Sequence, residues 1–175
     1  MKRILFTLCI VAVISSCKSS RDKMIGKIEA TDKLLMADTL LKDDSLAAHQ
    51  YNNLNEFAIK FPKDEKTPTY LLKSADLSSR MNHTLQAFNT YKKVNDEFPD
   101  TKQGADAMFM MAFLYENNFK NYPKAKEYYA AFIAKYPNHS FVKDAQASLD
   151  MLNSGKTLEE MVKEWEAKAD STAKK

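Results

Sequence analysis

The sequence predicts an all-α fold in which antiparallel pairs of helices stack one after another, and three observations support this class. An aromatic residue followed by proline occurs at residues 61–62, 98–99 and 136–137, spaced 37 and 38 residues apart, so a structural unit repeats. Only three glycines and five prolines occur, and the prolines stand where a helix would begin or end. Between these stops, apolar residues recur at helical spacing, with charged residues between them.

The first two helices are expected between residues 24 and 61. Isoleucine and leucine residues predict a helix over 24–41, with Thr31-Asp32 as a candidate interruption. Residues 43–45, Asp-Asp-Ser, form a turn that can accept the first free N–H groups of the next helix. That helix ends at Pro62. Its apolar face consists of Leu46, Tyr51, Leu54, Phe57 and Phe61.

Prolines also delimit the next two helix pairs. Thr67-Pro68 is typical of an N-cap followed by the first helical residue and predicts a helix over 68–81, whose partner ends before Pro99. Asp100 and Gln103 have the spacing of a capping box and predict the start of the central pair, which runs to Pro137.

The C-terminal part predicts one more helix and then a capping helix. Residues 141–152 carry apolar residues at helical spacing, and Asn153-Ser154-Gly155 is a helix stop. Over 157–168, Thr157 and Glu160 again have capping-box spacing. This helix should cover the open end of the stack, because a terminal repeat otherwise leaves its apolar face in water. Residues 169–175 form a polar tail. The apolar stripe of the capping helix is Leu158, Met161, Val162 and Trp165.

The N-terminus predicts a lipoprotein signal peptide over residues 1–16 that is removed. Lys2 and Arg3 precede an apolar run that is too short to span a bilayer. Residues 14–17, Ile-Ser-Ser-Cys, resemble the bacterial lipobox, in which a cysteine receives a diacylglyceryl group and the chain is cut before it. The alternative is an ordinary signal peptide with Cys17 near its end. Residues 17–23 are then the lipidated cysteine and a short polar tether.

The residue after the cysteine predicts the location of the protein. The net charge argues against one class of partner. Lipoproteins with a residue other than aspartate after the cysteine, here Lys18, usually travel to the outer membrane. We therefore expect a lipid-anchored protein of the bacterial cell envelope, on the outer membrane and facing the periplasm. Without Lys2 and Arg3 the chain has 24 basic and 23 acidic residues, a net charge of +1. Such a balance does not favour a nucleic-acid partner.

Small residues recur at fixed distances before the stop prolines. This pattern resembles the tetratricopeptide repeat, where a small residue lets two helices approach closely, with the usual period of about 34 residues lengthened by three or four. The resemblance implies a right-handed solenoid of helix pairs over 24–168. The lipobox and the longer repeats resemble the periplasmic proteins related to the outer-membrane assembly factor BamD and the cell-division coordinator CpoB. The small residues are Ala75, Ala87, Ala112 and Ala125, with Gln50 in place of alanine in the first repeat.

No pattern in the sequence predicts catalysis. His49, His83 and His139 lack the i,i+4 partner that would place two metal ligands on one helix face. The three glycines are isolated, so no phosphate-binding loop is expected. We therefore expect no enzyme, no cofactor and no small-molecule substrate.

The resemblance implies a scaffold for protein–protein interactions, with an envelope protein or peptide as partner and the membrane contacted through lipid on Cys17. In tetratricopeptide repeats the first helix of each pair lines a concave groove. For Phe109 and Phe113 there is an equal alternative, in which both side chains belong to the hydrophobic core and do not line the groove. A peptidoglycan- or glycan-binding envelope protein is the alternative function. The candidate groove residues are Leu72, Asp76, Ser79, Arg80, Phe109, Phe113, Glu116 and Asn117.

Overall fold

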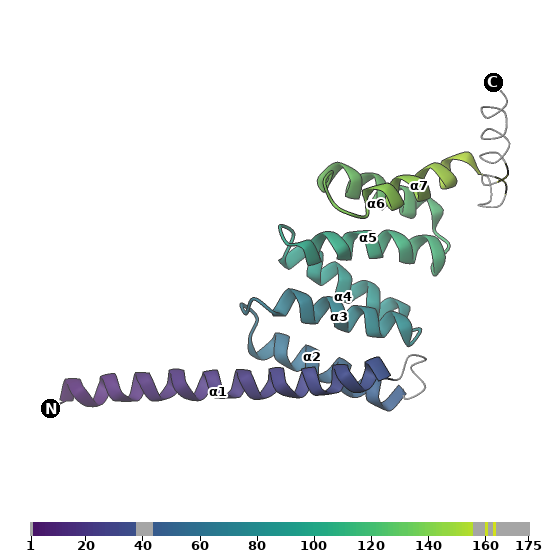
Figure 1. Ribbon diagram of the computed structural model, residues 1–175. Helices are drawn as coiled ribbons and strands as arrows, with labels where there is room; N and C mark the ends of the chain where they lie inside the picture. The colour runs from purple at the N-terminus through teal and green to yellow at the C-terminus, as the bar shows by residue number, and fades with distance from the viewer. Residues whose placement is uncertain (1, 38–43, 156–159, 161–162, 164–175) are drawn as a thin grey trace, which may run out of the picture. The chain divides into compact units, whose positions relative to one another are not determined.

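The computed structural model describes residues 2–37, 44–155, 160 and 163 of the 175-residue chain. Within these residues the protein is all-α, and its seven helices pack sequentially in antiparallel pairs, which confirms the predicted class (Figure 1). The chain divides into two compact units, residues 1–90 and 91–175. The right-handed sense of the stack stays a prediction. The predicted capping helix lies outside the described residues except for Glu160 and Lys163.

Unit 1 is built from α1 (Lys2–Ala37), α2 (Asp44–Lys60), α3 (Thr67–Arg80) and the first half of α4 (Thr84–Glu97). Helix α2 packs against both α1 and α3. The Phe57 ring lies at the centre of the core and meets the edge of Tyr70 with ring centroids 4.8 Å apart. Ile28 brings α1 into the same buried cluster. Three helices thus share one core, as the apolar spacing of the sequence predicts.

Helix α1 does not break at Thr31-Asp32. The Thr31 hydroxyl donates a hydrogen bond to the Lys27 carbonyl oxygen one turn earlier, at 3.0 Å. The Asp32 carboxylate accepts hydrogen bonds from Gln50 at 2.8 Å and from Lys73 at 2.6 Å. Because both polar side chains find partners compatible with helical backbone, nothing competes with the helix at this point.

Gln50 occupies the position at which the other repeats have alanine, and its side chain is fully buried. Its amide nitrogen donates to the Ile28 carbonyl oxygen at 2.9 Å as well as to Asp32. A buried amide is tolerated when its hydrogen bonds are satisfied. The first repeat therefore replaces the close alanine contact with a polar connection between α2 and α1.

Residues 18–23, expected as a tether, lie within α1. The Arg21 guanidinium donates two hydrogen bonds to the Asp64 carboxylate on the α2–α3 loop, one of them at 3.1 Å. This side-chain hydrogen bond is the main reason that the pKa of Asp64 lies below its usual value. The ion pair thus joins α1 to the α2–α3 loop within unit 1.

Unit 2 contains the second half of α4, α5 (Lys102–Asn117), α6 (Tyr122–Lys135) and α7 (Val142–Ser154). Helix α6 packs against both α5 and α7. The Phe109 ring lies near three other aromatic rings, with centroid distances of 5.8 Å to Tyr129, 5.6 Å to Phe132 and 4.8 Å to Phe141. This aromatic core sits among fully or nearly fully buried alanines. The alanines are Ala105, Ala112, Ala125 and Ala145.

Two predicted helix caps are wrong by one residue. Thr67 is the first residue of α3 and not its cap, because its hydroxyl donates to the Phe61 carbonyl oxygen at 2.6 Å. Thr101, not Asp100, caps α5: its backbone is extended and its side-chain oxygen accepts a hydrogen bond from the Gly104 N–H at 3.0 Å. The helix stop at Gly155 is confirmed, with a left-handed φ of 66°.

Replacing Ala112 by leucine should destabilise unit 2 by about 1–3 kcal/mol, because a fully buried position on α5 has no room for a larger side chain. Urea denaturation followed by circular dichroism measures the loss. The matched control is Ala130→Leu on the exposed side of α6, expected to change stability by less than about 0.5 kcal/mol. Equal unfolding midpoints for the two variants would contradict the proposed register.

Candidate functional site

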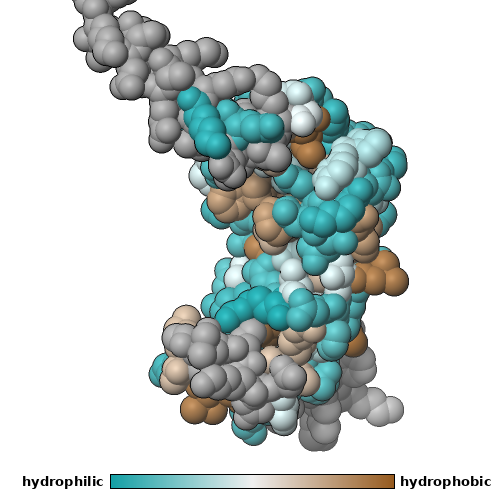
Figure 2. All heavy atoms as spheres, turned by 90° about the vertical axis from the view of Figure 1, so that its right-hand side faces the viewer, coloured by the Kyte–Doolittle hydropathy of each residue, from teal (hydrophilic) through white to brown (hydrophobic). Residues whose placement is uncertain are grey.

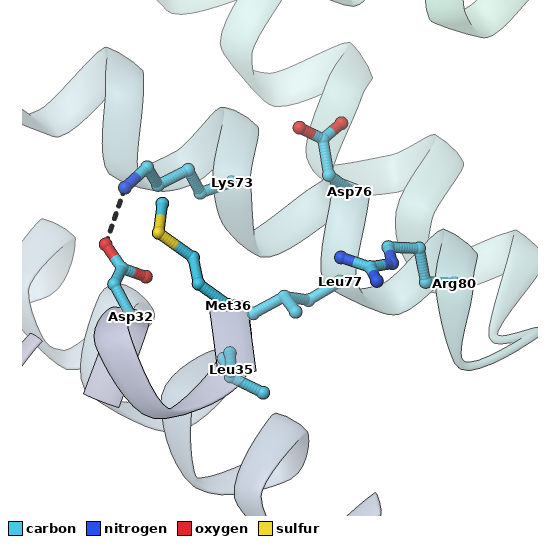
Figure 3. Close-up of a pocket in the computed structure, with 7 residues that line it drawn as sticks. All are labelled: Asp32, Leu35, Met36, Lys73, Asp76, Leu77 and Arg80. Atoms are coloured by element: carbon cyan, nitrogen blue, oxygen red, sulfur yellow. Dashed lines mark hydrogen bonds and ion pairs between the residues drawn. The ribbon is translucent and has the colours of Figure 1, made fainter. Parts of the chain in front are cut away.

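Unit 1 contains a cavity of about 390 Å³ between α1 and α3, the first helices of two successive pairs (Figure 3). Helix α1 contributes residues from its last two turns, and α3 contributes one face of its C-terminal half. The tetratricopeptide resemblance predicts a groove along the first helices, and the position of that groove on this chain stays a prediction. The lining residues are Asp32, Leu35, Met36, Lys73, Asp76, Leu77 and Arg80.

The floor of this α1–α3 cavity is apolar. Leu77 is buried in the core of unit 1, and Leu35 is partly buried against the same core. Met36 is 77% exposed beside them. An exposed methionine next to an apolar floor suits a contact surface, because its unbranched side chain adapts to different shapes.

Charged side chains form the rim of the cavity. The Lys73 ammonium lies 2.6 Å from an Asp32 carboxylate oxygen, so these two charges are engaged with each other. Figure 3 shows this bridge at one end of the cavity, with Asp76 and Arg80 at the other end. The Arg80 side chain is exposed at this rim, one helical turn after Asp76. A cation with five N–H donors is thus available beside an apolar floor.

The structure places the other candidate groove residues differently. On α3, Leu72 and Ser79 are half-buried and do not line the cavity. Together with Asp76 and Arg80 they all belong to unit 1, whereas the remaining four candidates lie on α5 in unit 2. A single groove that joins the two sets therefore stays a prediction.

On α5, the two phenylalanines have different surroundings. Phe109 packs against the aromatic core of unit 2, the arrangement that the core alternative describes. Phe113, in contrast, is 41% exposed. Glu116 is only 8% exposed and accepts a hydrogen bond from the Tyr129 hydroxyl at 2.7 Å. Burial, followed by this hydrogen bond, raises the pKa of Tyr129. Asn117 is exposed and donates to the Phe113 carbonyl oxygen.

A second cavity, of about 510 Å³, lies in unit 2 beside Glu116 and Asn117. Its other walls come from the α5–α6 loop, the start of α6 and the end of α7. The sequence did not predict these residues as part of a site. The available signal was that lysines and aromatic residues alternate between the end of α5 and the start of α6. The further lining residues are Lys120, Tyr122, Lys126, Met151, Leu152 and Gly155.

On the face shown in Figure 2, hydrophobic side chains form separate patches on an otherwise hydrophilic surface. The exposed large apolar residues include Met36 and Tyr122, one beside each cavity.

Among the residues that the structure describes, no helix has both the length and the apolar character needed to cross a bilayer. The same part of the chain holds no cluster of three metal-ligating side chains. His139 instead lies 3.2 Å from an Asp106 carboxylate oxygen.

Comparison with known proteins identifies a repeat in unit 2. The family model of the tetratricopeptide repeat matches residues 106–139, which span most of α5 and all of α6. The chain is also similar to one of the subunits of eukaryotic translation initiation factor 3 from Neurospora crassa, with 34% identity over 80 residues. That match covers 45% of this chain and only 9% of the relative. No solved structure matches the chain.

The matched segment agrees with the geometry of the helix pair. Ala112 on α5 and Ala125 on α6 are both fully buried within it, at the small-residue positions of the repeat. The matched family is an interaction repeat rather than a catalytic family. The protein is therefore an all-helical repeat protein that contains a tetratricopeptide repeat, and this repeat indicates protein partners.

Proposed function

We propose that the protein is a lipid-anchored lipoprotein of the bacterial cell envelope that acts as a scaffold for protein–protein interactions, with the α1–α3 cavity as its peptide-binding surface. The observation that carries the proposal is the pairing of an apolar floor with the exposed Arg80 guanidinium, between two successive first helices. The tetratricopeptide match supports a protein partner.

The chemistry of the cavity defines the partner as a peptide with an apolar side chain next to a carboxylate. The apolar side chain would be buried against Leu77 and Met36. The carboxylate would accept charge-assisted hydrogen bonds from Arg80, whose planar guanidinium suits bidentate binding. Lys73 is less available for this role because Asp32 already engages it.

The position of Arg21 supports an anchor close to the folded domain. Cys17 precedes Arg21 by four residues of continuous helix, a rise of about 6 Å at 1.5 Å per residue. Because Arg21 is bound to Asp64 on the α2–α3 loop, lipid on Cys17 would hold this loop next to the membrane. Asp32 follows Cys17 by fifteen residues, or about 22 Å along α1. The cavity would thus remain open to the periplasm beyond the headgroups.

Replacing Arg80 by glutamate should reduce partner capture by about tenfold or more, because a hydrogen-bonded charge pair contributes about 1.5–3 kcal/mol and 1.4 kcal/mol corresponds to a factor of ten. A photo-crosslinking amino acid at position 36 traps the partner in intact cells, and mass spectrometry identifies it. The readout is the yield of that one crosslinked species in the Arg80→Glu background.

The matched control is Lys63→Glu, the same charge reversal on the exposed α2–α3 loop away from the cavity. It should leave the crosslink yield unchanged. Helical content should stay near that of the wild type in both variants, because both positions are exposed. Equal yields for Arg80→Glu and wild type would place the contact surface elsewhere. Retention of the chain on isolated sacculi would favour the glycan-binding alternative instead.

A further inference from the structure

Gln50 on α2 is fully buried, and its amide nitrogen donates two hydrogen bonds to α1. The acceptors are the Ile28 carbonyl oxygen at 2.9 Å and an Asp32 carboxylate oxygen at 2.8 Å. The amide oxygen accepts a hydrogen bond from the Asn53 side chain at 3.4 Å. A flipped amide would place its oxygen against two acceptors, so these neighbours fix its orientation. Gln50 therefore holds the Asp32 carboxylate in one place.

The Asp32 carboxylate connects Gln50 to the rim of the α1–α3 cavity. One of its oxygens accepts from Gln50, and the other lies 2.6 Å from the Lys73 ammonium on α3. An ion pair between two mobile side chains gains little, because both lose rotational freedom when they meet. Here a buried donor already holds Asp32, so mainly Lys73 loses freedom. This pair should therefore be more fully formed than an ordinary surface ion pair.

The ion pair gives the two ends of the cavity different properties. At one end the Lys73 ammonium is engaged beside the Asp32 carboxylate, whereas Asp76 and Arg80 lie at the other end (Figure 3). A ligand carboxylate that approached Lys73 would meet the negative charge of Asp32, and such a repulsive contact selects against the ligand. Arg80 has five N–H donors in a planar arrangement, so it can bind a carboxylate in a bidentate manner beside Asp76.

We propose that Gln50 is a positioning residue for the peptide site. Through Asp32 it keeps Lys73 engaged, so that the cavity binds a peptide with one carboxylate, at the Arg80 end, and selects against a second carboxylate at the Lys73 end. The inference rests on the proposed function for the kind of ligand, but not for the connection from Gln50 through Asp32 to Lys73. Substitutions along this connection should change which peptides bind, and not only how stable unit 1 is.

The first measurement needs no ligand. In the full chain in detergent micelles, ¹⁵N NMR detects lysine ammonium groups whose protons exchange slowly with water. Lys73 should give such a signal, which Lys73→Arg identifies by removing it. Asp32→Asn and Gln50→Met should each broaden the signal, and Gln50→Met nearly conserves the side-chain volume while removing both donors. Gln50→Ala is a second variant, because alanine occupies this position in the other repeats. Far-ultraviolet circular dichroism shows that the variants remain folded.

The second measurement uses two synthetic peptides, both acetylated and amidated. Each contains one leucine, with a glutamate on one side in the first peptide and on both sides in the second. The wild type should prefer the peptide with one glutamate. Asp32→Asn should shift the ratio of the two dissociation constants by about fivefold toward the second peptide, the contribution of an exposed ion pair to the released Lys73. Gln50→Met should shift the ratio in the same direction by a smaller factor.

Glu56→Gln is the control, because it removes a carboxylate that pairs with Lys60 on α2, outside the cavity. It should change neither the Lys73 signal nor the ratio. A Lys73 signal unaffected by Gln50→Met would overturn the inference, as would an unchanged ratio in Asp32→Asn. Binding of neither peptide to any variant would overturn the peptide site and with it the selectivity, whereas the NMR comparison would still decide whether Gln50 holds Lys73 through Asp32.

Discussion

Gly104→Ala is expected to destabilise unit 2 by about 3 kcal/mol or more, because overpacking against backbone cannot be relieved by a side-chain rotation. A Cβ atom at position 104 would lie 2.1 Å from the Phe98 carbonyl oxygen and 2.9 Å from its carbonyl carbon. It would also lie 3.1 Å from the Pro99 Cα atom. The start of α5 would have to move away from the end of α4.

Hydrogen bonds around the α4–α5 loop oppose this movement. The Asn95 amide donates to the Gly104 carbonyl oxygen at 2.8 Å and to the Tyr136 hydroxyl oxygen at 3.1 Å. The Tyr136 hydroxyl in turn donates to the Pro99 carbonyl oxygen at 2.9 Å. Displacing the loop would therefore break bonds that join α4, α5 and the end of α6. The extra methyl group should therefore destabilise unit 2 by more than its overpacking alone would.

Gly26→Ala is the matched control, since a Cβ atom there meets nothing within 4 Å. In an exposed helix, alanine is favoured over glycine by about 0.8–1.0 kcal/mol, so this variant should be slightly more stable than the wild type. Urea denaturation of both variants gives the two free energies of unfolding. If Gly104→Ala were as stable as Gly26→Ala, the close approach of Phe98 to α5 would be wrong.

The repeat predicted the helix pairs well, because the signals involved are local. Prolines at fixed intervals mark helix ends, and alanines such as Ala112 and Ala125 mark positions where two helices touch. The caps were less predictable. Asp100 and Thr101 are both good N-cap residues, and the choice between them depends on backbone angles that the sequence does not show.

The sequence could not reveal contacts that depend on the third dimension. Gly104 is an isolated glycine in the sequence, and only the position of the Phe98 carbonyl group explains it. Phe109 and Phe113 share one face of α5, yet only Phe109 packs against Phe141 before α7. Periodicity alone gives both phenylalanines the same prediction.

Two of the predicted groove residues line a cavity, and whether they bind a partner stays a prediction. Asp76 and Arg80 follow from the position of α3 as a first helix, and both line the α1–α3 cavity. Asp32 and Met36 were missed because they come from α1, about 40 residues earlier in the chain. The Asp32–Lys73 bridge joins residues 41 positions apart, and no local pattern indicates such a pair.

Cys17→Ser should abolish lipid attachment completely, the largest effect expected of any substitution in the proposed envelope function. A serine hydroxyl cannot form the thioether on which diacylglyceryl transfer and cleavage depend. Each buried methylene contributes about 0.8 kcal/mol, and stable anchoring takes more than one acyl chain. Loss of the whole lipid group therefore removes the anchor at a single step. In cells fed labelled palmitate, the variant should remain unlabelled and accumulate as the uncleaved precursor.

Cys9→Ser is the control, because the only other cysteine lies in the segment that the lipobox prediction removes. This variant should take up label and be cleaved like the wild type, since the apolar run tolerates one small polar residue. The pair separates lipidation at Cys17 from any general effect of losing a cysteine. Equal label in Cys17→Ser and Cys9→Ser would mean that palmitate enters elsewhere. Cleavage of Cys17→Ser without label would identify an ordinary signal peptide, and the scaffold would then act without a membrane anchor.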